Sequence, residues 1–201
     1  MGTLLKFSRA IDALNAFVGR WVIWLILAST VISGVNAVVR KAFNMSSNAY
    51  LEVQWYLFAA AFLLAAGYTL LNGEHVKIDV ISSKLSKRKQ IWIDVIGFAL
   101  FLTPMCIVIL YYAVPFFLQG WRSGEMSSNA GGLVRWPVYL MMPVGFALLL
   151  LQGLSEFIKR IAFLRGLIPD PTQKLVAKTP EEELAEEIRR QAEAAERAAK
   201  A

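Results

Sequence analysis

The sequence has very little of the two side chains that most often hold metals and redox groups. Its 201 residues include one cysteine, Cys106, and one histidine, His75. One cysteine excludes a disulfide or a thiolate metal cluster within the chain, and one histidine excludes the paired axial ligands of a membrane di-haem protein. HExxH motifs and nucleophiles beside a base are also absent. We therefore expect no cofactor, no metal site and no enzymatic activity, and we expect Cys106 to be a small buried hydrophobic residue.

Polar residues are too few for a soluble domain of this size, because 57% of the residues are hydrophobic and the mean hydropathy is positive. Apolar runs cover residues 21–39, 50–71, 91–119 and 133–157. About 20 helical residues suffice to cross the hydrocarbon core of a bilayer. The connections hold only ten to nineteen residues, which leaves no room for a soluble domain between the runs. The pattern predicts an all-α integral membrane protein with four transmembrane helices.

The net charge of +6 is distributed as in a membrane protein rather than a nucleic-acid-binding protein. Outside the C-terminal tail, eleven lysines and arginines lie on one side of the four runs and four on the other. Because cytoplasmic loops carry the excess of positive charge, the distribution places both termini and the 72–90 loop in the cytoplasm. The eleven are Lys6, Arg9, Arg20, Lys77, Lys84, Lys87, Arg88, Lys89, Lys159, Arg160 and Arg165, and the four are Arg40, Lys41, Arg122 and Arg135.

The two ends of the chain have different patterns. Apolar residues recur every three or four positions over residues 1–20, which predicts a cytoplasmic amphipathic lead-in helix at the membrane surface. A cleaved signal peptide does not fit, because the following run is as long as a full span and no small-x-small cleavage site follows it. Residues 166–201 form a charged cytoplasmic tail. Thr179 and Pro180 can begin a helix there, so we expect the tail to be partly helical and mostly solvated.

Glu52 is the single charged residue of the second apolar run and lies near its start. A carboxylate in a membrane helix is costly and requires a partner. Arg40 lies at a similar depth and is one candidate for an ion pair. The alternative is that Arg40 reaches the phosphate headgroups while Glu52 contacts interfacial water. The sequence leaves both interpretations open, together with a third, in which a partner subunit binds Glu52.

After the second run, residues 73–92 read GEHVKIDVISSKLSKRKQIW. Apolar residues can occupy one side of a helix here and basic residues the other, which predicts a short interfacial helix on the anionic inner leaflet. His75 lies near Glu74 and Asp79, but these three residues lack the spacing of a metal site. A solvated loop histidine fits better.

The third run has 29 residues, about 43 Å if helical, so it must tilt, kink or extend beyond a hydrocarbon core of about 30 Å. Pro104 and Pro115 provide positions for a kink. Aromatic residues gather at its outer end, as in an interfacial belt. The loop that follows, residues 120–137, is rich in glycine and serine. It is either an ordinary turn or a surface that binds a polar or anionic partner.

The fourth run begins with an interfacial group formed by Trp136, Pro137 and Tyr139. Pro137 lies in the first helical turn, where its missing N–H costs least. Pro143 lies farther in and predicts a local kink or a close helix contact. Gln152 and Glu156 then follow, four residues apart, and can form hydrogen bonds to another helix.

Taken in order, four stretches resemble the small four-helix membrane subunit of tripartite ATP-independent periplasmic (TRAP) transporters. They are VVRKAF (38–43), LEVQWYLF (51–58), GEHVKIDV (73–80) and RWPVYLMMPVGFALLLLQ (135–152). Each is loose by itself, but their succession over about residues 10–160 is fairly specific. The acidic tail is not covered by the resemblance.

The resemblance implies a sodium-coupled secondary transporter for organic anions, either carboxylates or sulfonates, in a bacterial inner membrane. A periplasmic solute-binding protein delivers the solute to a large multi-span subunit, and the small subunit is the scaffold beside the moving part. The implied partners of this chain are therefore the large subunit, the solute-binding protein as a transient partner, and membrane lipid. The pattern does not require this chain to bind sodium or substrate.

The resemblance also implies roles for single residues. The flexible outer loop near Arg122, Glu125 and Arg135 would contact the binding protein. Residues at the motif positions would hold the fold or face the large subunit; they are Arg40, Glu52, Trp55, His75, Asp79, Trp136, Pro137, Tyr139, Pro143 and Gln152.

The physical argument for a partner rests on buried polar groups. Glu52, Gln152 and Glu156 lie in or near the bilayer, and the sequence shows no obvious cationic partner at the inner end. A neighbouring subunit could satisfy them, which favours an obligate complex. The alternative function is an autonomous four-helix transporter in which Glu52 exchanges protons for cations. Such a site requires a carboxylate near mid-membrane, and Glu52 lies too near the outer end.

Overall fold

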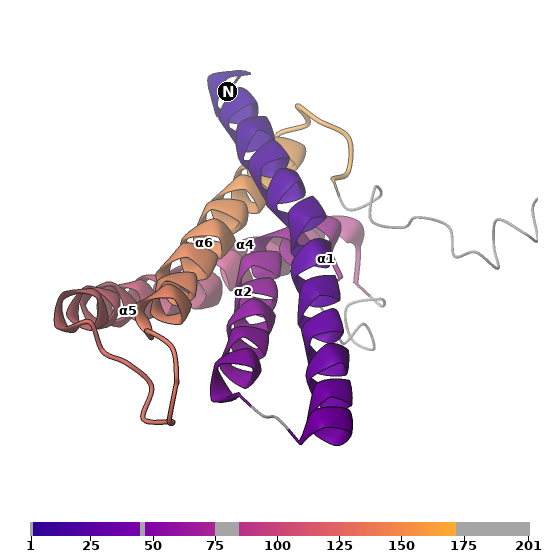
Figure 1. The fold of residues 1–201 in the computed structure, drawn as a ribbon. Helices are drawn as coiled ribbons and strands as arrows, with labels where there is room; N and C mark the ends of the chain where they lie inside the picture. The colour runs from indigo at the N-terminus through magenta and orange to yellow at the C-terminus, as the bar shows by residue number, and fades with distance from the viewer. Residues whose placement is uncertain (1, 45–46, 75–84, 172–201) are drawn as a thin grey trace, which may run out of the picture. The chain divides into compact units, whose positions relative to one another are not determined.

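A computed structural model describes residues 2–44, 47–74 and 85–171 (Figure 1). The chain divides into two units, residues 1–168 and 169–201, and only residues 169–171 of the second unit are described. All named elements of the described part are helices. Their order is α1 (Gly2–Phe43), α2 (Asn48–Asn72), α4 (Lys87–Gly97), η1 (Phe98–Leu102), α5 (Thr103–Ser123) and α6 (Trp136–Leu164).

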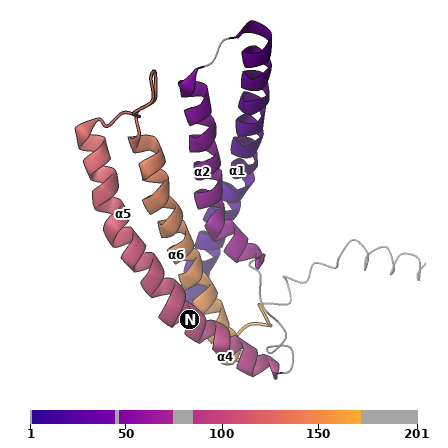
Figure 2. The same cartoon turned by 90° about the horizontal axis from the view of Figure 1, so that it is seen from below.

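Helix α1 joins the expected lead-in segment and the first apolar run into one 42-residue helix. Residues 2–43 contain no proline, and the single interior glycines do not stop the helix. One face is buried in its first half, through Ser8, Ile11, Asn15, Gly19 and Val22. Helix α2 lies beside it (Figures 1 and 2). Gly73 ends α2 in the left-handed conformation, which glycine adopts without steric cost.

The third span runs from Lys87 to Ser123 as α4, η1 and α5 without a break. Its middle part, η1, is a π-helical turn in which the Thr103 N–H bonds to the Phe98 carbonyl five residues back. This turn lies directly before Pro104, which has no N–H and whose ring would clash with the carbonyl four residues earlier in a regular α-helix. Pro115 remains inside α5. The predicted irregularity therefore takes the form of a wider turn at the first proline.

Helix α6 is the central helix, because it packs against α1, α2, α4, η1 and α5. It also has more buried positions than any other described helix. Glycines allow the close approaches. A Cβ on Gly145 would lie 2.6 Å from the backbone oxygen of Leu63 in α2, and one on Gly153 would lie 2.3 Å from a methyl group of Leu102. Small residues at such crossings let membrane helices approach one another closely.

Four described helices are long and apolar enough to cross a membrane: α1, α2, α4 to α5 as one rod, and α6. The all-α fold with four spans is thereby confirmed, whereas the cytoplasmic placement of the termini stays a prediction. Cys106 is fully buried in α5, as expected. Residues 85–86 precede α4, which begins with the basic stretch Lys87 to Lys89. The rest of the expected interfacial helix, with His75 and Asp79, lies outside the described residues, as does the helix expected in the tail.

Candidate functional site

Polar side chains gather at the two ends of the helix bundle. At one end, Glu52 in α2 is only 3% exposed and accepts hydrogen bonds from the loop between α5 and α6. The Ser127 hydroxyl and the Asn129 amide bind one carboxylate oxygen, the latter at 2.9 Å, and the Leu133 N–H binds the other at 2.7 Å. We call these four residues the loop clamp. Hydrogen bonds to a charged acceptor are about twice as strong as neutral ones.

The same half of α2 holds the loop at two further points. The Asn48 side chain donates to the Ala130 carbonyl at 3.0 Å, and the Tyr56 hydroxyl donates to the Val134 carbonyl at 3.2 Å. The loop also closes on itself. Met126 pairs with Val134 in an antiparallel bridge, and the Arg135 N–H bonds to the Glu125 carbonyl at 2.9 Å. The loop is therefore an ordered hairpin-like segment that lies against α2.

A charged pair lies beside the loop clamp. Arg135 contacts Glu125 at 3.1 Å, and the Tyr139 hydroxyl donates to the same Glu125 oxygen at 3.1 Å. Hydrogen bonding to Tyr139, together with the charge of Glu125, raises the pKa of Arg135. Both side chains of the pair are more than a third exposed. The ion pair therefore contributes little to stability and is accessible to a partner. Arg122 is exposed nearby.

The aromatic residues predicted near the outer end pack against α5. Trp136 meets Trp121 edge to face, with centroids 4.4 Å apart, and the Tyr139 ring lies 4.3 Å from that of Phe116. Tyr139 also covers Gly120, where a Cβ would lie 2.5 Å from its ring. Pro137 is in the first turn of α6 and Pro143 is buried inside it.

Arg40 and Trp55 lie apart from this cluster. Among the ion pairs of the described residues, none joins Arg40 to Glu52, whose oxygens bind the loop instead. Arg40 is exposed and lines a polar groove of about 470 Å³ with Lys41 and Gln54. Trp55 is 61% exposed on the outward face of α2.

At the other end of the bundle, α1 and α6 share a buried polar network. Gln152 is fully buried and bridges the two helices. Its amide donates to Asp12 at 2.9 Å and to Glu156 at 3.2 Å, and its carbonyl accepts from Asn15 at 2.9 Å. Because the amide nitrogen must face the carboxylates, the amide orientation of Gln152 is fixed. The Ser155 hydroxyl completes the contact between the helices, with the Ser8 hydroxyl at 2.7 Å.

Charged residues extend this network to α4. Lys159 pairs with Asp12 at 2.9 Å and also with Glu156. Arg160, which is 3% exposed, pairs with Glu156 and with Asp94 of α4, the latter at 2.9 Å. Its guanidinium lies 4.7 Å from the ring centroid of Phe98, within the range of a cation–π contact. We use the name buried polar network for Ser8, Asp12, Asn15, Asp94, Gln152, Ser155, Glu156, Lys159 and Arg160.

The expectation that Glu156 has no cationic partner at the inner end of the chain was wrong, whereas the expected hydrogen bonds from Gln152 to another helix are confirmed. Lys159 and Arg160 lie three and four residues after Glu156, which is the spacing of neighbours on one helix face. The sequence contained the signal. Positions 152, 155, 156 and 159 form one polar stripe, and positions 8, 12 and 15 form another with the same periodicity. A lead-in helix at the membrane surface would turn this second stripe toward water, whereas the structure packs it against α6.

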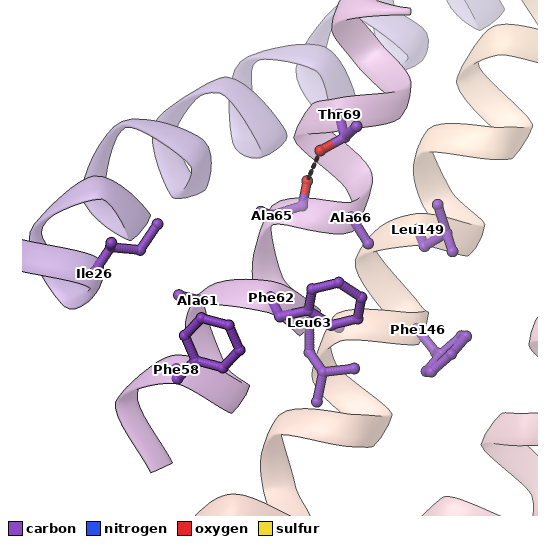
Figure 3. A pocket seen from close by; sticks show the side chains of 11 residues that line it. Ile26, Phe58, Ala61, Phe62, Leu63, Ala65, Ala66, Thr69, Phe146 and Leu149 are labelled. Atoms are coloured by element: carbon purple, nitrogen blue, oxygen red, sulfur yellow. Dashed lines mark hydrogen bonds between the residues drawn. The ribbon is translucent and has the colours of Figure 1, made fainter. Parts of the chain in front are cut away.

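An apolar groove of about 570 Å³ lies between these two ends (Figure 3). Helices α1, α2 and α6 line it, with Ile26, Phe62 and Phe146 among the lining residues. Its one hydroxyl, on Thr69, donates to the Ala65 carbonyl of its own helix at 3.0 Å. The groove therefore suits an apolar helix or acyl chains rather than a polar solute. Within the described residues, no group of three or more metal-ligating side chains is present.

Comparison with known proteins gives one result. No curated protein and no solved structure matches the chain. A family model described as the DctQ component of tripartite ATP-independent periplasmic transporters matches residues 29–163, which is more than half of the 201 residues. This stretch includes the last third of α1, all of α2, α4, η1 and α5, and nearly all of α6. The chain therefore belongs to the DctQ family, the small membrane component of TRAP transporters.

Proposed function

We propose that this chain is the scaffold subunit of a sodium-coupled secondary transporter for organic anions in the bacterial inner membrane. A large multi-span subunit moves the solute, which a periplasmic solute-binding protein delivers. The family membership supports a role in such a transporter. The scaffold role rests on a separate observation about the polar groups inside the bundle.

That observation is that the buried carboxylates find their partners within the chain. The carboxylates of Asp12, Asp94 and Glu156 each contact a cation of the same chain, and Glu52 is bound by the loop. An ion or solute site needs polar groups that are open to the ligand. The described residues instead use these groups to fix the helices to one another, as a static component would.

Copurification tests the proposal. We expect mild-detergent affinity purification of the full chain from its native membrane to yield a much larger hydrophobic protein in equal amount, identified by mass spectrometry. Vesicles that contain both proteins should take up solute only when sodium and the binding protein are supplied. If the chain is isolated alone or as a homodimer, and drives transport by itself in vesicles, it is the autonomous proton-coupled transporter and Glu52 is its carrier residue.

A further inference from the structure

The loop between α5 and α6 combines two properties that seldom occur together. Its composition is that of a flexible segment, with Gly124, Gly131 and Gly132 among its residues, two of them at positive φ. Yet five hydrogen bonds tie it to α2, across 75 to 82 residues of sequence. A loop that only connected two helices would require none of these bonds.

Glu52 makes three of the five bonds. It is a carboxylate in an apolar helix, where a charge is costly, and the part of the loop that it binds contains no cation. The Ser127 hydroxyl, the Asn129 amide and the Leu133 N–H do not neutralise the charge of Glu52, but their hydrogen bonds fix the position of the loop. The arrangement therefore uses a buried charge to hold a polar loop in one conformation.

The exposed side of this loop is mostly polar and charged, with Met126 as the one large exposed apolar residue of residues 124–135. Arg122, Glu125, Ser128 and Asn129 are exposed, and Arg135 lies beside Glu125. Such a surface suits a soluble protein better than lipid tails. Fixing it before contact lowers the entropy that binding must overcome. The loop also lies at the end of the bundle opposite the buried polar network, hence opposite the predicted cytoplasmic side.

We propose that the loop clamp is a positioning device, in which Glu52 holds residues 124–135 as a preformed docking surface for the periplasmic solute-binding protein. The inference rests on the proposed function, because it takes the binding protein as the partner. Glu52 itself contacts neither solute nor ion. It acts through the loop, so its loss should weaken the productive encounter with the binding protein and leave the transport step intact.

The test uses the complete complex in vesicles, with the initial uptake rate measured against the concentration of binding protein. Glu52→Gln preserves the size of the side chain but replaces one acceptor oxygen by a donor. We expect the half-saturating concentration of binding protein to rise about fivefold or more, with the maximal rate within about twofold of the unaltered complex. Glu74→Gln, which removes an exposed carboxylate at the opposite end of the same segment, is the matched control and should change neither quantity.

A second variant separates positioning from assembly. The double variant Ser127→Ala, Asn129→Ala removes two of the bonds to Glu52 without altering any helix. It should reproduce the rise in half-saturating concentration even if Glu52→Gln lowers the yield of complex. Direct binding of the binding protein to detergent-solubilised complex should weaken by the same factor.

Three results would overturn the proposal. A fall in maximal rate at unchanged half-saturation would assign Glu52 to the transport step. No change in the double variant would show that the loop is only a connection. Equal weakening in Glu74→Gln would show that general loss of charge is responsible. Each of these leaves the scaffold role standing, whereas failure to isolate a large subunit would remove that role first.

Discussion

Single glycines fix how closely the helices of this chain approach. Gly145 is the most restrictive, because the atoms that a Cβ would meet first belong to the backbone of α2 at Leu63, which cannot move aside. Gly34 in α1 is a contrasting site with nothing within 4 Å of a built Cβ. Both positions are glycines in a helical backbone, but Gly34 has room for a larger side chain and Gly145 has none.

We expect Gly145→Ala to destabilise the protein by about 1–3 kcal/mol through overpacking, and Gly34→Ala to leave stability unchanged or slightly raised, since alanine favours helix more than glycine does. Thermal unfolding of the detergent-solubilised complex, followed by tryptophan fluorescence, measures the difference. Equal midpoints for the two variants would contradict the close packing of α2 on α6.

The sequence predicted that Glu52 needs a partner but did not show which residues supply it. A carboxylate in an apolar run requires a partner, and this much follows from its charge. The partner proved to be uncharged donors 75 to 81 positions away. Hydrogen bonds of this kind depend on which loop the tertiary fold brings near Glu52. The pairing of Arg40 with Glu52 was considered only because the two residues lie at a similar depth, and depth does not show which loop packs against α2.

The polar stripes on α1 and α6 hold these two helices together through hydrogen bonds and ion pairs. Arg160 is buried and pairs with Glu156 and Asp94, so removing its charge takes one of two cations from the buried Glu156 carboxylate, which keeps Lys159. We expect Arg160→Met to destabilise the protein by about 3–5 kcal/mol. Adding Glu156→Gln should recover part of this loss, since the buried carboxylate that lost the Arg160 cation is then neutral.

Thermal unfolding of both single variants and the double variant forms a double-mutant cycle for this pair. Arg165→Met, an exposed arginine just after α6, serves as the control and should unfold at the same temperature as the unaltered protein. If the two single effects simply add, the pair is not coupled and the buried polar network is not the tie between α1, α4 and α6.

The π-helical turn η1 is equivalent to one extra residue inserted in an α-helix, which lets α4 and α5 each present a chosen face to α6. We expect deletion of Ala99 together with Pro104→Ala to restore a regular helix while both faces stay in register, with little loss of stability. Deletion of Val108 from the regular part should instead rotate the end of α5 by about 100° and move Gly120 away from Tyr139. Yield and unfolding temperature of the two deletions, compared in detergent, decide between these outcomes.

At the scale of elements, hydropathy predicted the spans well because long apolar helices are what a bilayer requires. It did not show that residues 2–20 continue without a break into the first span. From the pattern of residues 2–20 alone, a polar residue such as Asp12 is expected to face water. It belongs to the buried polar network because α6 packs against it. Amphipathic periodicity identifies a face but not what covers it.

In the whole molecule, the loop clamp and the buried polar network are separated by about the thickness of a membrane. Arg135 at the start of α6, beside the loop clamp, and Glu156 in the buried polar network are 21 residues apart, which is about 32 Å along a helix, close to a hydrocarbon core of about 30 Å. Both clusters can therefore lie at opposite interfaces, with the apolar groove between them at membrane depth. This spacing explains how one small chain holds several charges without placing any in the centre of the bilayer.

Full burial of Cys106 makes the chain a natural background for chemical topology mapping, because a membrane-impermeant maleimide has no native thiol of this chain to reach. We expect Ser128→Cys, in the exposed loop, to react in intact cells, and Thr3→Cys, near the start of α1, to react only after the membrane is opened. The reverse order would place the docking loop in the cytoplasm. Because Cys106 is buried, each introduced cysteine is the thiol of this chain that the reagent reaches, and it reports on which side of the membrane its residue lies.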